Sequence, residues 1–301
     1  MTVSATAALL AEVFPGSAAG RSEYLEWLYE QSPFGGVIET NLDDQLGRAG
    51  HYALVPMTLS RDGTNLDAAL SLNTAVHERA RGGGAFVRLA SETIEQARRR
   101  GVRAVIGVAN ANSTPGFVRR LDFELVQPLP ANVLVPTPGP TGDIRSAWAS
   151  PDAFSPGGLV AGTEALLDAP AAGEARRWTI ETLRWRLACP GSKYAVHRSD
   201  GILAVSCCDE RHGIRVAVLL KVFADKAMSA ANRRAIVRAV CWFHRAPVAL
   251  HVGLNHRAYF SGVPLPKRMR ESPLNLIFRR LEDVTRPASI VNFEFLDFDA
   301  Y

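Results

Sequence analysis

The run Arg79-Ala-Arg81-Gly82-Gly83-Gly84 is the segment of this sequence whose residue types most directly suggest chemistry. Three consecutive glycines allow a tight backbone with positive φ angles, because no Cβ stands in the way. Their N–H groups can then converge on one concavity, and a helix directly after them adds the positive end of its dipole. Such a loop suits a diphosphate, with Arg79 and Arg81 adding positive charge. The glycines alone fit a plain strand-to-helix turn without a ligand equally well.

The elements around this loop would hold it between a strand and a helix. A strand is predicted over residues 66–75, and a helix with one apolar stripe over residues 86–100. Gly101 stands where a glycine ends many helices, and a buried strand is predicted over residues 102–108. The loop is neither GxGxxG nor a P-loop, since it lacks the Lys-Ser/Thr pair.

The order of predicted elements repeats along the chain. In the first half we predict helices over 22–30 and 115–121, strands over 37–42 and 51–60, and a strand from Phe123. In the second half we predict helices over 178–187, 230–243 and 275–281, and strands over 194–198, 202–208, 215–223 and 248–253. This order predicts an α/β protein with two tandem copies of one fold.

A proline-rich segment separates the two halves. Residues 128–158 carry seven prolines, which remove backbone donors and fix φ, so we predict a linker there. A boundary near residue 145 gives domains 1–145 and 146–301. A length of 301 residues is also typical of two domains.

Charge and cysteine content exclude several classes of protein. The net charge is −2 over residues 1–127 and +6 over residues 128–301, which is too mild for a committed nucleic-acid binder. The four cysteines include no CxxC pair, so neither a disulfide framework nor a zinc site is indicated. No signal-peptide pattern and no spanning apolar segment is recognised, which favours a cytoplasmic protein without a metal.

The glycine loop also matches a family signature. Arg79-x-x-Gly82-x-Gly84 resembles the (Gln/Arg)-x-x-Gly-x-(Gly/Ala) motif of the GCN5-related N-acetyltransferase (GNAT) superfamily. Segments 71–77, 110–113 and 117–123 resemble a bacterial subgroup of these proteins, and the resemblance covers about residues 22–135. The second half resembles a divergent copy, in which Ala-Asp-Lys-Ala-Met replaces the glycine loop.

The resemblance implies a mixed sheet splayed into a V and an acyl-CoA cosubstrate, acetyl-CoA or longer. The acyl group would pass to the amine of a small-molecule acceptor, with the second domain shaping the acceptor pocket. Amides of residues 81–85 would bind the pyrophosphate, and backbone groups of residues 72–74 would contact the acyl carbonyl. The implied cofactor-binding residues are Leu72, Asn73, Thr74, Arg79, Arg81, Gly82, Gly83, Gly84 and Ala85.

Three residues are candidates for catalysis. His51 lies on a predicted strand beside the expected cleft and could act as the general base, or be a half-buried strand histidine. Glu78 could orient or deprotonate the amine, or be a solvated loop charge. Asn112 follows a buried strand at the expected site face and could act in the site, or belong to a segment that only caps the helix before Pro115.

The sequence departs from the superfamily at two positions. Asp122 replaces the glycine of the usual Leu-Gly-Phe, and Val118 stands where a tyrosine often protonates the leaving thiolate. A non-catalytic acyl-CoA-binding protein and a sugar-nucleotide-binding α/β protein therefore remain alternatives. The basic run 266–270 could meet the 3′-phosphate of CoA or an anionic acceptor, but we interpret it as a solvated face. The triplet 297–299 resembles a metal-binding DxD motif, and we interpret it as a chance match.

Overall fold

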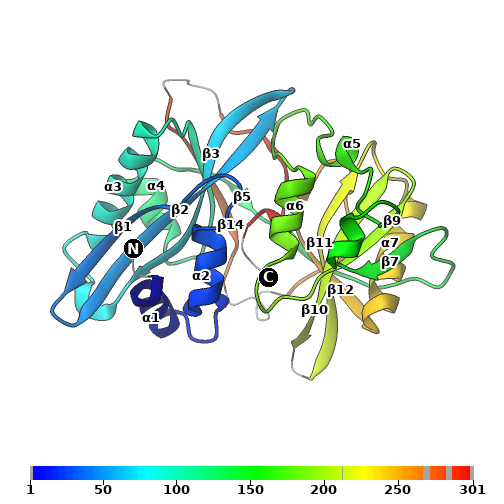
Figure 1. Cartoon of the computed structure of the whole chain (residues 1–301), viewed down its shortest axis with the longest axis horizontal. Coiled ribbons are helices and arrows are strands. Elements are labelled where there is room, and N and C mark those ends of the chain that lie inside the picture. Colours follow the sequence, from blue (N-terminus) through cyan, green and yellow to red (C-terminus); the bar gives the residue numbers. More distant parts are fainter. Residues whose placement is uncertain (1–2, 212, 267–271, 283–286, 299–301) are drawn as a thin grey trace. The chain divides into compact units, whose positions relative to one another are not determined.

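The computed structural model describes residues 3–211, 213–266, 272–282 and 287–298. The chain divides into two compact units, each built on a β-sheet with helices packed on it (Figure 1). The first unit comprises Met1–Leu59, Thr64–Pro128 and Ser272–Ala288. The second comprises Ser60–Gly63, Leu129–Glu271 and Ser289–Tyr301. The predicted α/β architecture with a mixed sheet is confirmed.

The sheet of the first unit has the order β1-β2-β3-β4-β14-β5. β3 and β4 run parallel, whereas the pairs β1–β2, β4–β14 and β14–β5 are antiparallel. Its strands are β1 (Ile38–Asp44), β2 (Gly47–Arg61), β3 (Thr64–Val76), β4 (Ala104–Ala109), β5 (Glu124–Pro128) and β14 (Asn275–Arg280). Its helices are α1 (Val3–Val13), α2 (Ser22–Tyr29), α3 (Ala85–Arg99) and α4 (Thr114–Arg120).

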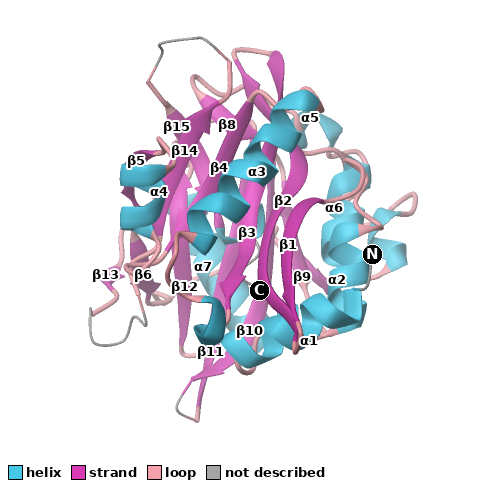
Figure 2. Ribbon diagram, turned by 90° about the vertical axis from the view of Figure 1, so that its left-hand side faces the viewer, coloured by secondary structure: helices cyan, strands magenta, loops and turns pink. Residues whose placement is uncertain are grey.

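Alternation along β2 sends side chains to both faces of this sheet. Tyr52 and Leu54 join the core that α3 completes with Leu89 and its apolar neighbours. Figure 2 shows α3 and α4 lying across the strands on this face. On the opposite face, His51 contacts Tyr29 of α2. The period of two in β2 thus places His51 away from the α3 core.

Strand β3 leaves its parallel partner after Ser71. Pairing with β4 covers Ala68–Ser71 against Ala104–Gly107, while β3 itself continues to Val76. Beyond this point Asn73 has a left-handed backbone, with φ +50°. The Ser71 hydroxyl lies 2.8 Å from that of Tyr52, yet the Asn73 side chain bonds Tyr29 on the other face. Since residues 71 and 73 of a regular strand share one face, the backbone at Asn73 reverses the alternation.

The prediction of a helix over residues 275–281 is wrong. These residues form strand β14, which lies between β4 and β5 and pairs with both. A short apolar run such as Leu276–Phe278 fits a helix or a strand equally well, so pattern alone could not decide. Hydrogen bonding on both sides of the segment decides for the strand.

The second unit repeats the arrangement in its sheet, in which β9, β10, β11 and β12 are consecutive and β11 and β12 run parallel. Its strands are β6 (Ala131–Leu134), β7 (Arg145–Trp148), β8 (Glu174–Arg176), β9 (Ala195–Ser199), β10 (Ile202–Arg211), β11 (Ile214–Ala224), β12 (Val248–Asn255), β13 (Val263–Pro264) and β15 (Ile290–Glu294). Its helices are α5 (Glu164–Leu167), α6 (Ile180–Leu187) and α7 (Ala230–His244). The predicted linker over residues 128–158 therefore contains two strands, β6 and β7, between its prolines.

No helix in the described part of the chain is long and apolar enough to cross a membrane. The basic run predicted as a solvated face lies, from residue 267 on, outside the described residues, as does Asp299.

Candidate active site

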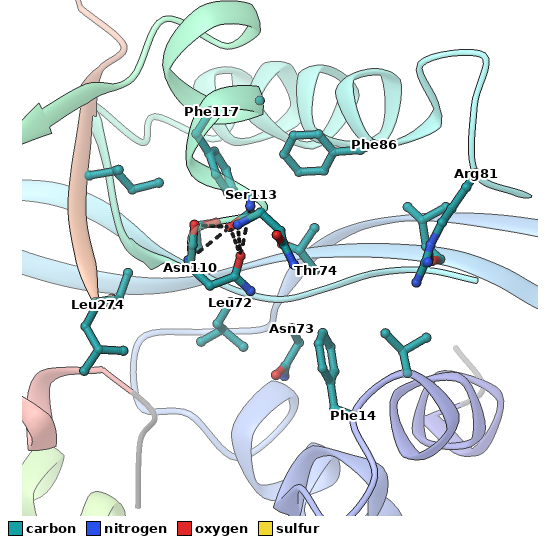
Figure 3. Close-up of a pocket in the computed structure, with 17 residues that line it drawn as sticks. Phe14, Leu72, Asn73, Thr74, Arg81, Phe86, Asn110, Ser113, Phe117 and Leu274 are labelled. Carbon is teal, nitrogen blue, oxygen red and sulfur yellow. Dashed lines mark hydrogen bonds between the residues drawn. The ribbon is translucent and has the colours of Figure 1, made fainter. Parts of the chain in front are cut away.

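A pocket of about 750 Å³ opens in the first unit where β3 and β4 part. Figure 3 shows Phe86 and Phe117 on one side of β3 and Phe14 on the other. The apolar lining consists of Val13, Phe14, Leu72, Val76, Phe86, Val108, Phe117, Leu274 and Ile277. The remaining lining residues are Ser71, Asn73, Thr74, Arg81, Asn110, Asn112, Ser113 and Gly116. Among these described residues one is cationic and none is acidic, so the pocket suits an apolar ligand that carries negative charge.

The structure brings five of the predicted site residues to this pocket. They are Leu72, Asn73, Thr74, Arg81 and Asn112. The others do not line it within the described residues: His51, Glu78, Arg79, Gly82, Gly83, Gly84 and Ala85. The glycine loop nevertheless joins Arg81 of the pocket to helix α3.

The three glycines of the loop all have positive φ angles. Gly82, Gly83 and Gly84 have φ angles of +93°, +55° and +75°, and a Cβ added to any of them would meet no heavy atom within 4 Å. Within the described residues their amides have no hydrogen-bond partner. Helix α3 begins directly after Gly84 and is 15 residues long. In the described structure three unpaired amide donors therefore stand directly before a helix N-terminus, an arrangement suited to an anion.

The free donors are fewer than the predicted range of residues 81–85. The amide of Arg81 donates to the carbonyl of Glu78 at 3.1 Å, and that of Ala85 to the carbonyl of Gly82 at 3.3 Å. These two amides close the turns on either side of the loop. The glycine amides between them are left for a ligand.

The two arginines of the loop differ in what they contact. Arg79 donates through Nε to Asp44 at 2.7 Å and through Nη2 to the carbonyl of Arg48 at 3.1 Å. The hydrogen bond from Arg79 lowers the pKa of Asp44. Arg81 lines the pocket with a side chain that is 59% exposed, and bonds the carbonyl of Val76 at 3.2 Å. Arg81 is therefore the cation better placed for a ligand, while Arg79 ties the loop to the β1–β2 hairpin.

A tight turn after β4 carries Asn112 to the pocket. Asn110 follows β4, and its Oδ1 accepts from the amides of Asn112 at 3.0 Å and Ser113 at 2.9 Å (Figure 3). Ser113 precedes α4, but its hydroxyl makes no bond to the first turn of that helix and bonds Asn110 instead. The side chains of Asn110 and Ser113 thus stabilise the turn itself.

An aromatic pair closes the pocket above β3. The Phe86 and Phe117 rings meet edge to face, with centroids 5.1 Å apart. A Cβ on Gly116 would lie 2.6 Å from the Phe86 ring, so glycine at this position lets α4 approach α3. Val118, which stands where the superfamily often has a tyrosine, is 36% exposed and does not line the pocket. No tyrosine, histidine, cysteine or carboxylate is found among the described lining residues.

His51 lies inside the protein rather than at the pocket surface. Its side chain is fully buried, and its ring nitrogens lie 2.9 Å from the Tyr29 hydroxyl and 2.7 Å from Asn41 Oδ1. Burial, with the charge of Arg48, lowers the pKa of His51 to about 3. Glu78, by contrast, has an 82% exposed side chain 3.4 Å from Arg81.

The buried histidines predict a loss of stability in acid. Burial lowers the pKa of His51 and of His197 to about 3, below the ordinary value of 6.5. Between these values the unfolded chain binds a proton that the folded chain does not, so the free energy of unfolding falls as pH falls. We expect roughly 1.4 kcal/mol per pH unit for each such histidine. Urea unfolding from pH 7 to pH 5 measures how steeply the free energy of unfolding changes with pH. His51→Gln should reduce this slope by the contribution of one histidine. An unchanged slope would contradict the lowered pKa of His51.

Sequence reasoning missed the pocket residues that come from distant segments. Phe14 follows α1, and Leu274 and Ile277 belong to the late segment that carries β14. Their apolar side chains carry no chemical signature. Only recognition of residues 275–280 as a strand of the first sheet could have found the last two.

The second unit differs from the first at the corresponding place. Pairing of β11 with β12 ends at Leu219 and His251, as that of β3 with β4 ends at Ser71 and Gly107. Beyond that point β15 pairs with β12, and the turn Phe295–Asp297 packs against β11 and β12. The C-terminal segment therefore lies where the first unit has its pocket.

Buried charges hold this segment in place. Lys221 Nζ lies 2.6 Å from Asp297 and 3.3 Å from Glu294, and all three side chains are almost fully buried. Burial alone raises the pKa of Glu294, but Lys221 and the hydrogen bond with His251 bring it below its ordinary value. The connection from β11 to α7 has no glycine, and the Ser229 hydroxyl caps α7 by accepting from the amide of Asn232.

Comparison with known proteins agrees with the fold. Residues 2–126 match the family model of an acetyltransferase (GNAT) domain. Among curated protein sequences none matches this chain. The resemblance inferred from the sequence is thus confirmed: the chain begins with a GNAT domain.

Solved structures extend the likeness to both units. A GCN5-related N-acetyltransferase from Anabaena variabilis aligns at TM-score 0.62 and 10% identity, covering 92% of this chain and 70% of its own. A probable N-acyltransferase from Enterococcus faecalis aligns at TM-score 0.63 and 12% identity, covering 93% and 70%. The N-myristoyltransferase of Saccharomyces cerevisiae with bound myristoyl-CoA aligns at TM-score 0.55 and 11% identity, covering 91% and 78%. At these identities the likeness shows the fold, which is that of the GNAT acyltransferases.

Proposed function

We propose that this protein is an acyl-CoA-dependent N-acyltransferase that transfers an acyl group, with acetyl as the first candidate, to a small-molecule amine. The observation that carries the proposal is the glycine loop, whose three unpartnered amides precede α3 and lead through Arg81 into the pocket. The GNAT family match of residues 2–126 supports it. We also propose a cytoplasmic location, in line with four free cysteines among the described residues.

The proposed assignment gives each part of the site one task. The amides of Gly82–Gly84 and the Arg81 guanidinium would bind the diphosphate of CoA. The pantetheine and acyl groups would lie in the apolar pocket, where residues 72–74 of β3 have no β4 partner. Backbone groups of these residues would stabilise the negative charge that develops on the thioester oxygen. Asn112, which also lines the pocket, would contact the acceptor.

The reaction is a direct transfer. The amine nitrogen attacks the thioester carbonyl carbon, the C–S bond breaks, CoA leaves as the thiolate, and the amine loses a proton. The described pocket lining has no side chain suited to take that proton or to protonate the thiolate. We therefore assign both proton transfers to water. Glu78, a carboxylate 3.4 Å from Arg81, does not line the pocket.

Two alternatives follow from specific observations. A non-catalytic acyl-CoA-binding protein would fit a pocket without an acidic or basic catalytic side chain. A sugar-nucleotide-binding protein would also use a glycine loop for a diphosphate. Thiol release from acetyl-CoA with a mixture of primary amines separates the enzyme from the binding protein.

Acetyl-CoA is expected to stabilise the protein through the diphosphate site. At about 100 times its dissociation constant, a ligand that binds only the folded chain adds about 2.7 kcal/mol to the free energy of unfolding. Thermal unfolding with acetyl-CoA, CoA and UDP-glucose tests this. A rise in melting temperature with UDP-glucose but not with either CoA compound would overturn the proposal.

Calorimetric titration with acetyl-CoA is expected to show one CoA site per chain. The second unit lacks the glycine loop, and its own C-terminal segment takes the corresponding place. Calorimetry should therefore give a stoichiometry near one, and a value of two would contradict the assignment. The domain boundary near residue 145 stays a prediction, but a fragment ending there would lack β14 and with it Ile277 of the pocket.

A further inference from the structure

A buried chain of hydrogen bonds runs from the pocket into the first unit. Asn73 Nδ2 donates to the Tyr29 hydroxyl at 3.0 Å, and that hydroxyl lies 2.9 Å from His51 Nε2. His51 Nδ1 lies 2.7 Å from Asn41 Oδ1, and Asn41 Nδ2 donates to Glu39 Oε1 at 3.0 Å. Tyr29 and His51 are buried, while Asn73 lines the pocket.

The chemistry of these groups fixes which atom donates in each hydrogen bond of the network. A carboxamide oxygen only accepts, so His51 Nδ1 must carry the hydrogen that Asn41 Oδ1 receives. In a neutral imidazole Nε2 then accepts, and the Tyr29 hydroxyl must donate to it. Burial lowers the pKa of His51 to about 3 and raises that of Tyr29, which keeps both groups neutral near pH 7. The Tyr29 oxygen is left to accept from Asn73, as observed.

Asn73, at the pocket end of this hydrogen-bond network, has an unusual backbone conformation. Asn73 has φ +50°, a conformation that asparagine tolerates better than most residues but that still costs free energy. Such a conformation persists where the surroundings enforce it. The side-chain bond to Tyr29 draws Asn73 toward α2, although the alternation of β3 would direct it to the face of Ser71.

We propose that Tyr29 and His51 are positioning residues, which hold Asn73 in its left-handed conformation and so orient the β3 backbone toward the thioester. This role rests on the proposed function. It assigns His51 an action through Tyr29 and Asn73, in place of direct contact with the amine. Neither residue hydrogen-bonds the glycine loop in the described structure, so loss of the bond network should impair turnover and leave binding of the CoA diphosphate intact.

The primary test compares Tyr29→Phe and His51→Leu with His51→Gln, whose amide oxygen can still accept from Tyr29. Thiol release from acetyl-CoA is measured with a fixed mixture of primary alkylamines, and melting temperature checks that each variant is folded. We expect kcat to fall at least tenfold in the first two variants while KM for acetyl-CoA stays within threefold. His51→Gln should keep a kcat close to that of the unmodified chain. If Tyr29→Phe does not fold, the comparison of His51→Leu with His51→Gln decides.

A second measurement separates positioning from general destabilisation. Glycine adopts a left-handed φ without support from its neighbours. The tenfold effect of Tyr29→Phe on kcat should therefore shrink to less than threefold in an Asn73→Gly background. Equal effects in both backgrounds, or kcat values within threefold of the unmodified chain for both Tyr29→Phe and His51→Leu, would overturn the role.

The outcomes for the two proposals are distinguishable. If the unmodified chain releases thiol while the variants match it, the positioning role fails and the proposed function stands. If the unmodified chain neither binds acetyl-CoA in calorimetry nor releases thiol, the proposed function fails and the role fails with it.

Discussion

Replacement of Gly82 or Gly84 by valine is expected to lower the affinity for acetyl-CoA at least a hundredfold while the protein stays folded. Both glycines have positive φ angles, and a left-handed conformation costs an L-residue roughly 1–2 kcal/mol. No heavy atom lies within 4 Å of the added Cβ, so the cost is backbone strain in the loop, which a change toward negative φ would relieve. The amides would then turn away from the ligand, and the diphosphate would lose its donors. Calorimetric titration with acetyl-CoA measures the loss.

Gly63→Val is the matched control for this experiment. Gly63 has φ +77° in the turn between β2 and β3, and a Cβ there also meets no heavy atom within 4 Å. It introduces the same backbone strain outside the loop, so we expect unchanged affinity. If Gly82→Val and Gly84→Val also bind acetyl-CoA as the unmodified chain does, the loop is a plain turn.

Lys221→Met is expected to lower the free energy of unfolding by about 3–5 kcal/mol, because it leaves buried carboxylates without their cation. Lys221 Nζ lies 2.6 Å from Asp297, 3.3 Å from Glu294 and 2.7 Å from Asn292 Oδ1. Both carboxylate side chains have no exposed surface. Urea unfolding at pH 7 measures the effect.

Lys226→Met provides the comparison, since Lys226 is exposed on the following turn and its removal should cost little. A triple variant with Lys221→Met, Glu294→Gln and Asp297→Asn should recover part of the stability, because it removes the uncompensated charges. Equal stability of Lys221→Met and Lys226→Met would show that the C-terminal segment does not depend on this ion pair.

Local patterns in the sequence determined much of the first unit. The amphipathic helix after Gly84 and the apolar strand before Asn110 are set by residues close in the chain, and both form as predicted. The glycine run allowed positive φ angles, and all three glycines have them. Five of the predicted site residues line the pocket, since they belong to the ends of β3 and β4 and to the segments that follow them.

Tertiary structure decided what those patterns left open. Whether residues 275–280 form a strand depends on β4 and β5, more than 140 residues earlier, which supply the hydrogen bonds. The hydrogen bonds that join Asn73 to Tyr29 and Tyr29 to His51 connect residues that no spacing in the sequence brings together. Likewise, the second unit lacked a glycine loop in its sequence, but only the fold placed Glu294 and Asp297 beside Lys221. Local sequence specifies local conformation, whereas contacts between distant segments depend on the packing and hydrogen bonding of the whole unit.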